Sequence, residues 1–157
     1  MGIRSTEEDF LTARLTAMQV ASIEHDLAEL DARDPYALEA GELRTFRTPD
    51  DPVVAPLVRL LHLILSSAVM KNATHVLLLP GEQTFEVAFF IVDAWQLEVQ
   101  PPHNLVNALG ELVKDLCGAA GAVKVRLRKG QTVHALASVR RTSHGTRTLI
   151  RLVDLYH

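Results

Sequence analysis

The chain has 157 residues, of which 48% are hydrophobic and 22% are charged, and its net charge at neutral pH is −3. This length and composition suit one packed domain and exclude general disorder. The single cysteine, Cys117, excludes an intrachain disulfide and a zinc site built from several cysteines, so we expect a reducing, cytoplasmic location.

The N-terminal segment is predicted to be a helical arm. Ser5 and Glu8 form an S-x-x-E capping box, and apolar residues on two overlapping faces predict a helix of about six turns that ends near Leu30. Asp34 followed by proline predicts a second, short helix, and residues 45–50 are predicted to be a polar connector. The acidic start of the sequence is not a signal peptide.

The remainder predicts an α+β domain. An Asp-Pro pair at 51–52 precedes an amphipathic helix that Asn72 can end, and Asn104 can cap a further helix that ends at Gly118 and Gly121. The run 53–70 contains Arg59 and His62, which favours a buried helix over a membrane span, so no membrane insertion is expected. Six strands are expected, over 74–79, 84–92, 95–99, 123–128, 133–140 and 146–153. Because the strands follow one another in hairpins, the sheet should be antiparallel. We therefore divide the chain into an arm and connector, 1–50, and an α+β domain, 51–157.

The charges are unevenly distributed along the chain. Residues 1–50 carry 5 basic and 11 acidic side chains, a net charge of −6, and residues 51–121 carry 3 and 7, a net charge of −4. Residues 122–157 carry 8 basic side chains and 1 acidic one, a net charge of +7. This asymmetry predicts either an electrostatic contact with a partner or between protomers, or simply solvated strand faces.

Three segments together resemble the front domain of the bacterial ATPases that drive type II secretion and type IV pilus assembly. They are the helix and strand PLVRLLHLILSSAVMKNATHVLLLP, the segment VAFFIVDAWQLEVQPP, and TSHGTRTLIRLVD at 142–154. In the last segment, His144, Gly145, Arg151, Leu152 and Asp154 match the family pattern. The resemblance covers about two thirds of the chain and implies a PAS-like antiparallel sheet with flanking helices in a pilus or secretion context.

The departures from that family concern its charged residues. Polar residues of the family's first strand correspond to His75, Leu77 and Leu79, and two strand arginines correspond to Ala88 and Phe90. The family's arginine-rich loop is reduced to GAAGAV at 118–123, and no lysine follows a glycine, so the G-x-x-x-x-G-K-[ST] phosphate loop is absent from the sequence. The resemblance implies that such arginines approach a nucleotide, and we expect that role to be lost.

The first and second expected strands should instead be apolar on both faces. Phe85, Val87, Phe89 and Ile91 alternate with Ala88, Phe90 and Val92, and Leu77 and Leu79 make the neighbouring strand apolar as well. One face must cover the core, and the other needs either the N-terminal helix or another protein chain. The residues predicted to contact a protein partner are Leu77, Leu79, Ala88, Phe90, Trp95, Arg126, Arg128, Arg140, Arg141 and Arg147.

No pattern of catalytic or metal-binding residues is present in the sequence. The seven histidines lack H-x3-H and H-E-x-x-H spacing, and Cys117 lies on the inward side of a helix end, as a small apolar residue would. His62 is predicted to be a packing residue and His144 to shape a turn. We therefore expect no enzyme activity, no cofactor and no metal.

The sequence favours a non-catalytic protein-interaction module, a stand-alone and degenerate copy of the motor's front domain. Its expected partner is a protein of the pilus, secretion or cell-polarity machinery, with an acidic surface such as the N-terminal helix of a second copy, and a homodimer is compatible with the long first helix. Three alternatives remain open at this point: a PAS-like sensor of a small ligand, nucleic-acid binding through the basic C-terminal strands, and a fragment of a full motor. Nucleic acid is disfavoured because no aromatic residues interleave the basic ones and the whole chain is acidic.

Overall fold

The structure, a computed structural model, describes residues 15–35, 43–47, 55–81, 85–98, 105–127 and 130–154. In chain order the elements are α2 (Ala17–Ala32), β1 (Thr45–Arg47), α3 (Pro56–Met70), β2 (His75–Pro80), β3 (Phe85–Ile91), β4 (Ala94–Leu97), α4 (Val106–Cys117), the 3-10 turn η4 (Gly118–Ala120), β5 (Ala122–Arg126), β6 (Thr132–Thr142) and β7 (Gly145–Val153).

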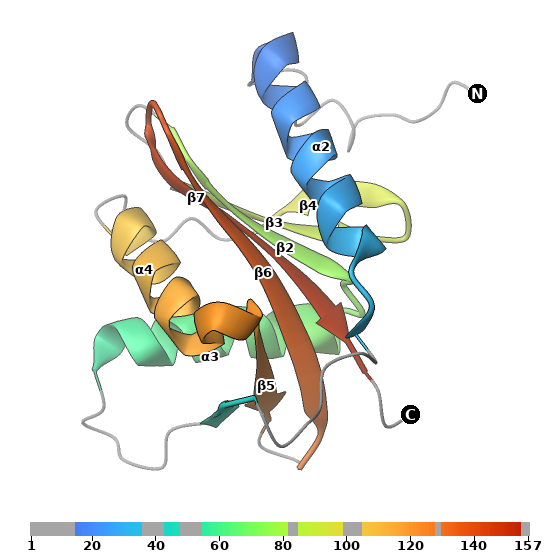
Figure 1. The fold of residues 1–157 in the computed structure, drawn as a ribbon, viewed down its shortest axis with the longest axis vertical. Helices are drawn as coiled ribbons and strands as arrows, with labels where there is room; N and C mark the ends of the chain where they lie inside the picture. Colours follow the sequence, from blue (N-terminus) through green and yellow to red (C-terminus); the bar gives the residue numbers. More distant parts are fainter. Residues whose placement is uncertain are drawn as a thin grey trace.

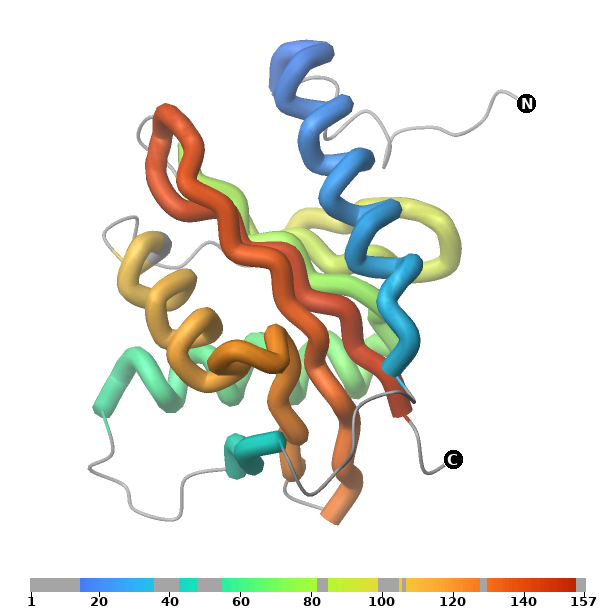
Figure 2. The backbone as a smooth tube through the Cα atoms, in the orientation of Figure 1, coloured from blue at the N-terminus to red at the C-terminus, as the bar shows by residue number. Residues whose placement is uncertain are grey.

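The strands form one sheet in the order β1-β5-β6-β7-β2-β3-β4. Every neighbouring pair is antiparallel except β1 and β5, which run parallel. In Figures 1 and 2 the long β6–β7 hairpin runs through the middle of the molecule, with α2 on one side of the sheet and α3 and α4 on the other. The α+β class and the mostly antiparallel sheet with flanking helices are confirmed.

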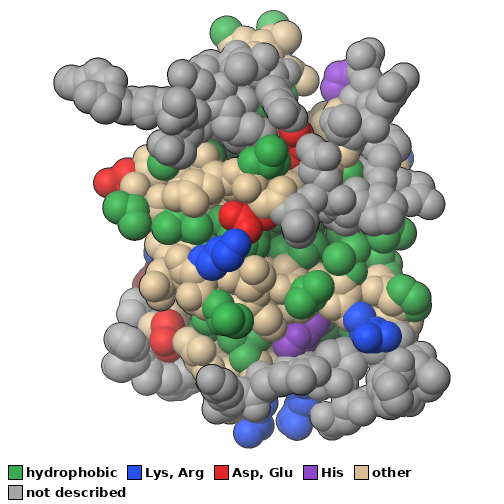
Figure 3. Space-filling model, turned by 180° about the vertical axis from the view of Figure 1, so that it is seen from behind, with side chains coloured by type: hydrophobic (Ala, Val, Ile, Leu, Met, Phe, Trp, Pro, Cys, Tyr) green, Lys and Arg blue, Asp and Glu red, His purple; other side chains and the backbone are tan. Residues whose placement is uncertain are grey.

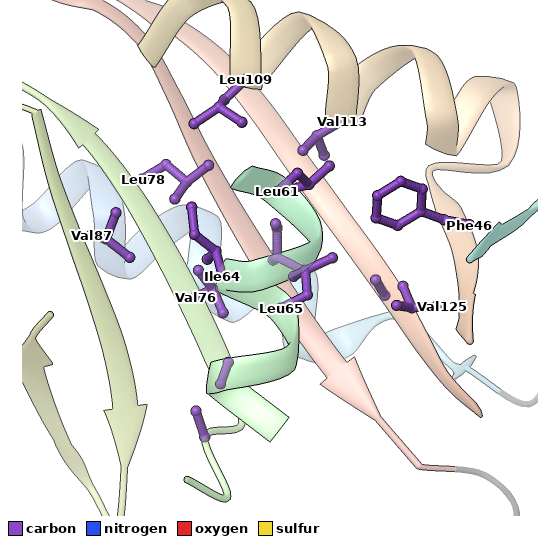
Figure 4. Close-up of a cluster of buried hydrophobic side chains, with 14 of the residues drawn as sticks. Phe46, Leu61, Ile64, Leu65, Val76, Leu78, Val87, Leu109, Val113 and Val125 are labelled. Atoms are coloured by element: carbon purple, nitrogen blue, oxygen red, sulfur yellow. The ribbon is translucent and has the colours of Figure 1, made fainter. Parts of the chain in front are cut away.

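The first face of the sheet, which α3 and α4 cover, holds the larger core. Its strand side chains come from alternate positions, such as Val76 and Leu78 on β2, and they meet Leu61, Ile64 and Leu65 of α3. Figure 4 shows these side chains converging between the helices and the strands. The period-two pattern of the strands therefore placed the correct residues on this face.

A close approach of α4 to β7 depends on Gly110. A Cβ atom at this position would lie 2.5 Å from Thr146 Cγ2, closer than two carbon atoms can pack. Glycine thus lets the helix axis come nearer to the sheet than any other residue would. The end of α4 is confirmed at Gly118, whose φ of 57° lies in the left-handed region. Asn72, with a φ of 60°, likewise follows the end of α3.

Two local predictions are wrong. The helix expected to continue from the N-terminal segment to Leu30 instead begins at Ala17, because Thr16 has an extended backbone (φ −71°, ψ 161°) and forms its own capping box with Gln19. The polar connector at 45–50 contains a seventh strand, β1, whose Phe46 is buried in the core of the first face. A strand of three residues with one apolar side chain has too little alternation to be predicted from sequence.

Several other predictions lie outside the described residues: the Ser5–Glu8 box, the helix from Asp34 onward apart from Pro35, and the caps at Asp51 and Asn104. None of the helices within the described ranges is long and apolar enough to cross a bilayer. The division into 1–50 and 51–157 stays a prediction.

Candidate protein-interaction site

The predicted apolar strand face is the second face of the sheet, and in the structure α2 lies across it. Leu77, Leu79 and Ala88 are buried there, against Ile23 and Leu30 of α2. Ala88 and Leu77 are 1% and 0% exposed, so a partner cannot touch them while α2 is in place. Of the two covers considered for this face, the N-terminal helix is the one that the structure contains.

The aromatic residues of the predicted site lie at the margin of this cover. Phe90 on β3 and Trp95 on β4 are opposite each other in the strand register, with ring centroids 5.1 Å apart. Trp95 is buried, whereas Phe90 is half-buried and also contacts the ring of His75 edge-on, at 5.8 Å. This pair continues the apolar second face toward the β3–β4 hairpin.

Two arginines on neighbouring strands hold one carboxylate of α2. Arg140 on β6 donates two hydrogen bonds to Asp26, from Nε to Oδ2 and from Nη2 to Oδ1, each 2.8 Å long. Arg147, opposite Arg140 on β7, donates to the same carboxylate and, at 3.3 Å, to Ser22 Oγ. Asp26 is 3% exposed, so its charge is stabilised by these bonds rather than by water. Hydrogen bonding to Asp26, followed by its charge, raises the pKa of Arg140 above its ordinary value.

A second polar contact fixes the C-terminal end of α2. Asp31 Oδ1 lies 2.7 Å from Nε2 of His75, whose Nδ1 is 2.9 Å from the Thr74 hydroxyl. Arg151 donates to the carbonyl oxygen of Arg33 at 3.0 Å. These bonds place the helix end over β2 and β7, where the apolar contacts alone would allow it to slide.

Arg33 anchors the chain just after α2. Its guanidinium donates to the carbonyl oxygens of Ala120 and Gly121, at 2.9 and 3.2 Å, and to that of Ala137 at 3.4 Å. The five N–H donors of a planar guanidinium have fixed directions, so one arginine can bond to several carbonyl oxygens in a defined geometry. The turn between α4 and β5 and the end of α2 are therefore tied together.

Acidic residues of the N-terminal part and basic residues of the C-terminal strands therefore contact each other within one chain. The sequence pointed to a partner or a second protomer as the acidic surface for Arg140 and Arg147, but Asp26 of the same chain holds both. The reason is geometric: Asp26 shares the buried face of α2 with Ile23 and Leu30, and that face rests on the strands that carry the arginines. Arg140 and Arg147 are two of the five arginines that were predicted to contact a partner.

The other predicted arginines do not join this site. Arg126 is exposed on β5, at a part of the sheet remote from Asp26. Arg141 is exposed on β6 and points to the first face, because side chains alternate along a strand and Arg140 points to the second. Arg128 lies outside the described residues. Sequence reasoning missed Asp26, Asp31 and Arg33; an aspartate within the apolar face of α2 was the available signal for the first.

Exposed apolar side chains are spread over the described surface. The large ones are Met18, Leu63, Met70, Val92 and Leu97. Figure 3, seen from the side opposite to Figure 1, shows hydrophobic side chains in several separate patches rather than in one continuous area. Val92 (86% exposed) and Leu97 (40% exposed) both belong to the β3–β4 hairpin, next to the half-buried Phe90.

Three candidates for a catalytic, metal or ligand site among the described residues fail on their own geometry: a carboxylate cluster on α2, the buried thiol of Cys117 and the cavity of the first face. His25, Asp26 and Glu29 are close enough together to hold a cation, but both oxygens of Asp26 are already bonded to arginines. Burial raises the pKa of the Cys117 thiol to about 11, against the opposing charge of Arg33, so it stays protonated. The cavity between α3, α4 and the first face has a volume of about 10 Å³, room for one water molecule rather than a ligand.

No protein-family model matches the sequence. The chain is 29% identical over 109 residues to the type IV pilus assembly ATPase PilB of Myxococcus xanthus. The aligned stretch covers 64% of this chain and 19% of that ATPase, so the chain spans about a fifth of the length of its curated relative. This distant, partial similarity agrees with the resemblance found from the three sequence segments.

Proposed function

We propose that this chain is a non-catalytic protein-interaction module that acts with type IV pilus or secretion proteins in the cytoplasm. One observation carries the proposal. Two positions at which the resembling motors carry strand arginines are Ala88 and Phe90, and both contribute to an apolar face that packs against a helix. A surface of this kind can bind a helix or strand of another protein, whereas a nucleotide needs charged donors.

The partner would contact the part of the second face that α2 leaves accessible. This hairpin surface consists of Phe90, Val92 and Leu97, with Trp95 beneath it. Aromatic side chains surrounded by smaller apolar ones are typical of binding hot spots. The similarity to a pilus assembly ATPase supports a pilus protein as the partner.

A pair of exposed substitutions tests this surface without disturbing the core. We expect the V92E/L97E variant to lose the partner proteins that the unmodified chain captures from native cytosol, as identified by mass spectrometry. L63E, on the opposite side of the sheet, places a charge on an equally exposed leucine and should capture the same proteins as the unmodified chain. Equal capture by all three proteins would place the interaction elsewhere.

Nucleotide binding is a separate test of the non-catalytic part of the proposal. Calorimetric titration with ATP and magnesium should give no heat of binding, because the two strand positions that carry arginine in the resembling motors are Ala88 and Phe90 in this chain. Saturable binding would overturn the assignment as a non-catalytic module.

The alternative function, a sensor of a small ligand, is not favoured by the described core. The cavity between α3, α4 and the first face has room for about one water molecule.

A further inference from the structure

The second face of the sheet carries another pair of arginines, at the edge remote from α2. Arg47 on β1 is paired in register with Arg126 on β5, and both side chains are exposed. They point to the second face because Phe46 and Val125, one residue earlier on each strand, point into the core of the first face. Neighbouring strands lie about 4.8 Å apart, so the two arginine side chains leave the sheet from adjacent positions.

This pair repeats the arrangement that holds Asp26. Arg140 and Arg147 are likewise paired in register on neighbouring strands and point to the same face. Arg126 is opposite Thr132 on β6, eight residues before Arg140, which separates the two pairs by about 26 Å at 3.3 Å per residue. In Figure 1, β1 and β5 lie at the lower edge of the molecule and α2 crosses its upper part. The carboxylate of Asp26 therefore bonds to Arg140 and Arg147 and lies too far away to bond to the second pair.

The surroundings of the second pair are also positive. Lys124 lies two residues before Arg126 on the same face, and its charge, after burial, contributes to lowering the pKa of His134. Lys124 also lines an open hollow of about 450 Å³, together with Gly130, Gln131, Thr132 and Asp154. Asp154 is the one acidic residue among those that line the hollow, and it already interacts with another group.

Like charges opposite each other on neighbouring strands destabilise a sheet, so Arg47 and Arg126 are not explained by folding. Within the described part of the chain neither forms an ion pair. Arg44, close by on the same edge, does bond to the carbonyl oxygen of Asp115 at 3.0 Å. A bound carboxylate would remove the repulsion between the two guanidiniums, as Asp26 does at the other pair.

We propose that Arg47 and Arg126 form a second carboxylate clamp, which binds an acidic helix of a partner protein in the way that Arg140 and Arg147 bind α2. A protein carboxylate fits better than a nucleic acid for two reasons. The chain as a whole has a net charge of −3, which repels a long polyanion, and none of the described phenylalanines or the tryptophan lies on this part of the face to stack on bases. This clamp is independent of the hairpin surface proposed above, and either can fail alone.

The test uses a fluorescein-labelled, alanine-based helical peptide whose glutamates are spaced four residues apart, so that they share one side of the helix. Fluorescence anisotropy at low ionic strength should show binding to the unmodified chain, and none when glutamine replaces the glutamates. In the R47Q/R126Q variant we expect the affinity to fall about tenfold or more, the effect of losing charge-assisted hydrogen bonds. Circular dichroism should show an unchanged fold, since both side chains are exposed.

The matched control is K114Q/R141Q, which removes the same number of positive charges from exposed positions away from the second face. We expect it to bind the peptide within about twofold of the unmodified chain, because screening limits the effect of distant charges. An equal loss in both variants would mean general electrostatic attraction and would overturn the clamp.

Two further outcomes would replace the proposed occupant. If a labelled single-stranded oligonucleotide bound more tightly than the peptide, and R47Q/R126Q abolished that binding, the site would be a phosphate site and the proposal would be wrong. If sedimentation velocity showed self-association that R47Q/R126Q removed, the occupant would be a second copy of this chain. Neither effect is expected.

Discussion

The two faces of the sheet are covered in chemically different ways. On the first face, α3 and α4 contribute almost purely apolar contacts, which converge from both helices onto six strands. On the second face, the single helix α2 combines a smaller apolar contact with a buried carboxylate held by Arg140 and Arg147. The larger core is thus apolar and the smaller one is partly ionic.

The first face therefore contributes mainly to the free energy of folding, and the second face mainly to the placement of α2. Apolar burial is favourable in proportion to area and is not directional, so the first face should supply most of the free energy of folding. A buried ion pair contributes little net stability, because desolvation offsets the attraction, but its hydrogen bonds specify one geometry. We infer that Asp26 chiefly determines where α2 lies on the second face.

The largest expected effect is a truncation in the first face. Phe89 on β3 is 1% exposed, and Phe89→Ala should lower the free energy of unfolding by about 4 kcal/mol, through lost burial and the cavity left behind. Urea denaturation measures this. Leu63→Ala, at an exposed position of α3, should change it by less than about 0.5 kcal/mol. A similar loss in both variants would contradict the assignment of this core.

Removing the carboxylate of α2 should have the next largest effect, confined to the second face. Asp26→Asn leaves the buried Arg147 guanidinium without a counter-charge, which costs about 3 kcal/mol unless α2 moves away. We expect the α2 amides to exchange hydrogen much faster while those of β6 and β7 stay protected. Glu24→Gln, on the exposed side of α2, is the control and should not alter exchange.

Acidification should weaken the second face through His134. Burial, and then the charge of Lys124, lowers the pKa of this histidine below its ordinary value of about 6.5. As the pH falls below 6.5, the unfolded chain binds a proton that the folded chain does not, so stability present above that pH decreases by at most about 1.4 kcal/mol per pH unit. Denaturation between pH 7 and 5 should show a shallower slope for His134→Gln. If the free energy of unfolding fell equally steeply with pH in both proteins, other histidines would be responsible for the loss of stability.

Much of the fold could be predicted because it depends on short-range patterns. Period-two alternation located the three C-terminal strands, and a nearly continuous apolar run located β2. Within β3, alternate positions assigned residues such as Val87 and Ala88 to opposite faces. Gly118 and Asn72 marked helix ends because both adopt positive φ. The strand β1 and the break at Thr16 were missed because each involves only three or four residues.

The candidate site was only partly predictable, because its key contacts join distant parts of the chain. The apolar residues of the second face were identified from their strands. The pairing of Asp26 with Arg140 and Arg147 was not, since 114 and 121 residues separate them. Charge counts showed an acidic front and a basic tail, but only the fold shows which strands α2 crosses.

The smallest predicted effect is a local one, at the N-terminal cap of α2. Thr16 Oγ1 accepts a hydrogen bond of 3.2 Å from the Gln19 amide, and Gln19 Oε1 accepts one of 2.9 Å from the Thr16 amide. Thr16→Ala removes the first of these and should destabilise α2 by about 1 kcal/mol, whereas Thr16→Ser keeps the hydroxyl and should cost less. Hydrogen exchange should show the loss in the first turns of α2 alone, because the first face does not depend on this helix. If the amides of β2 and β7 lost protection to the same extent, α2 and the sheet would unfold as one unit, and the second face could not be uncovered without losing the fold.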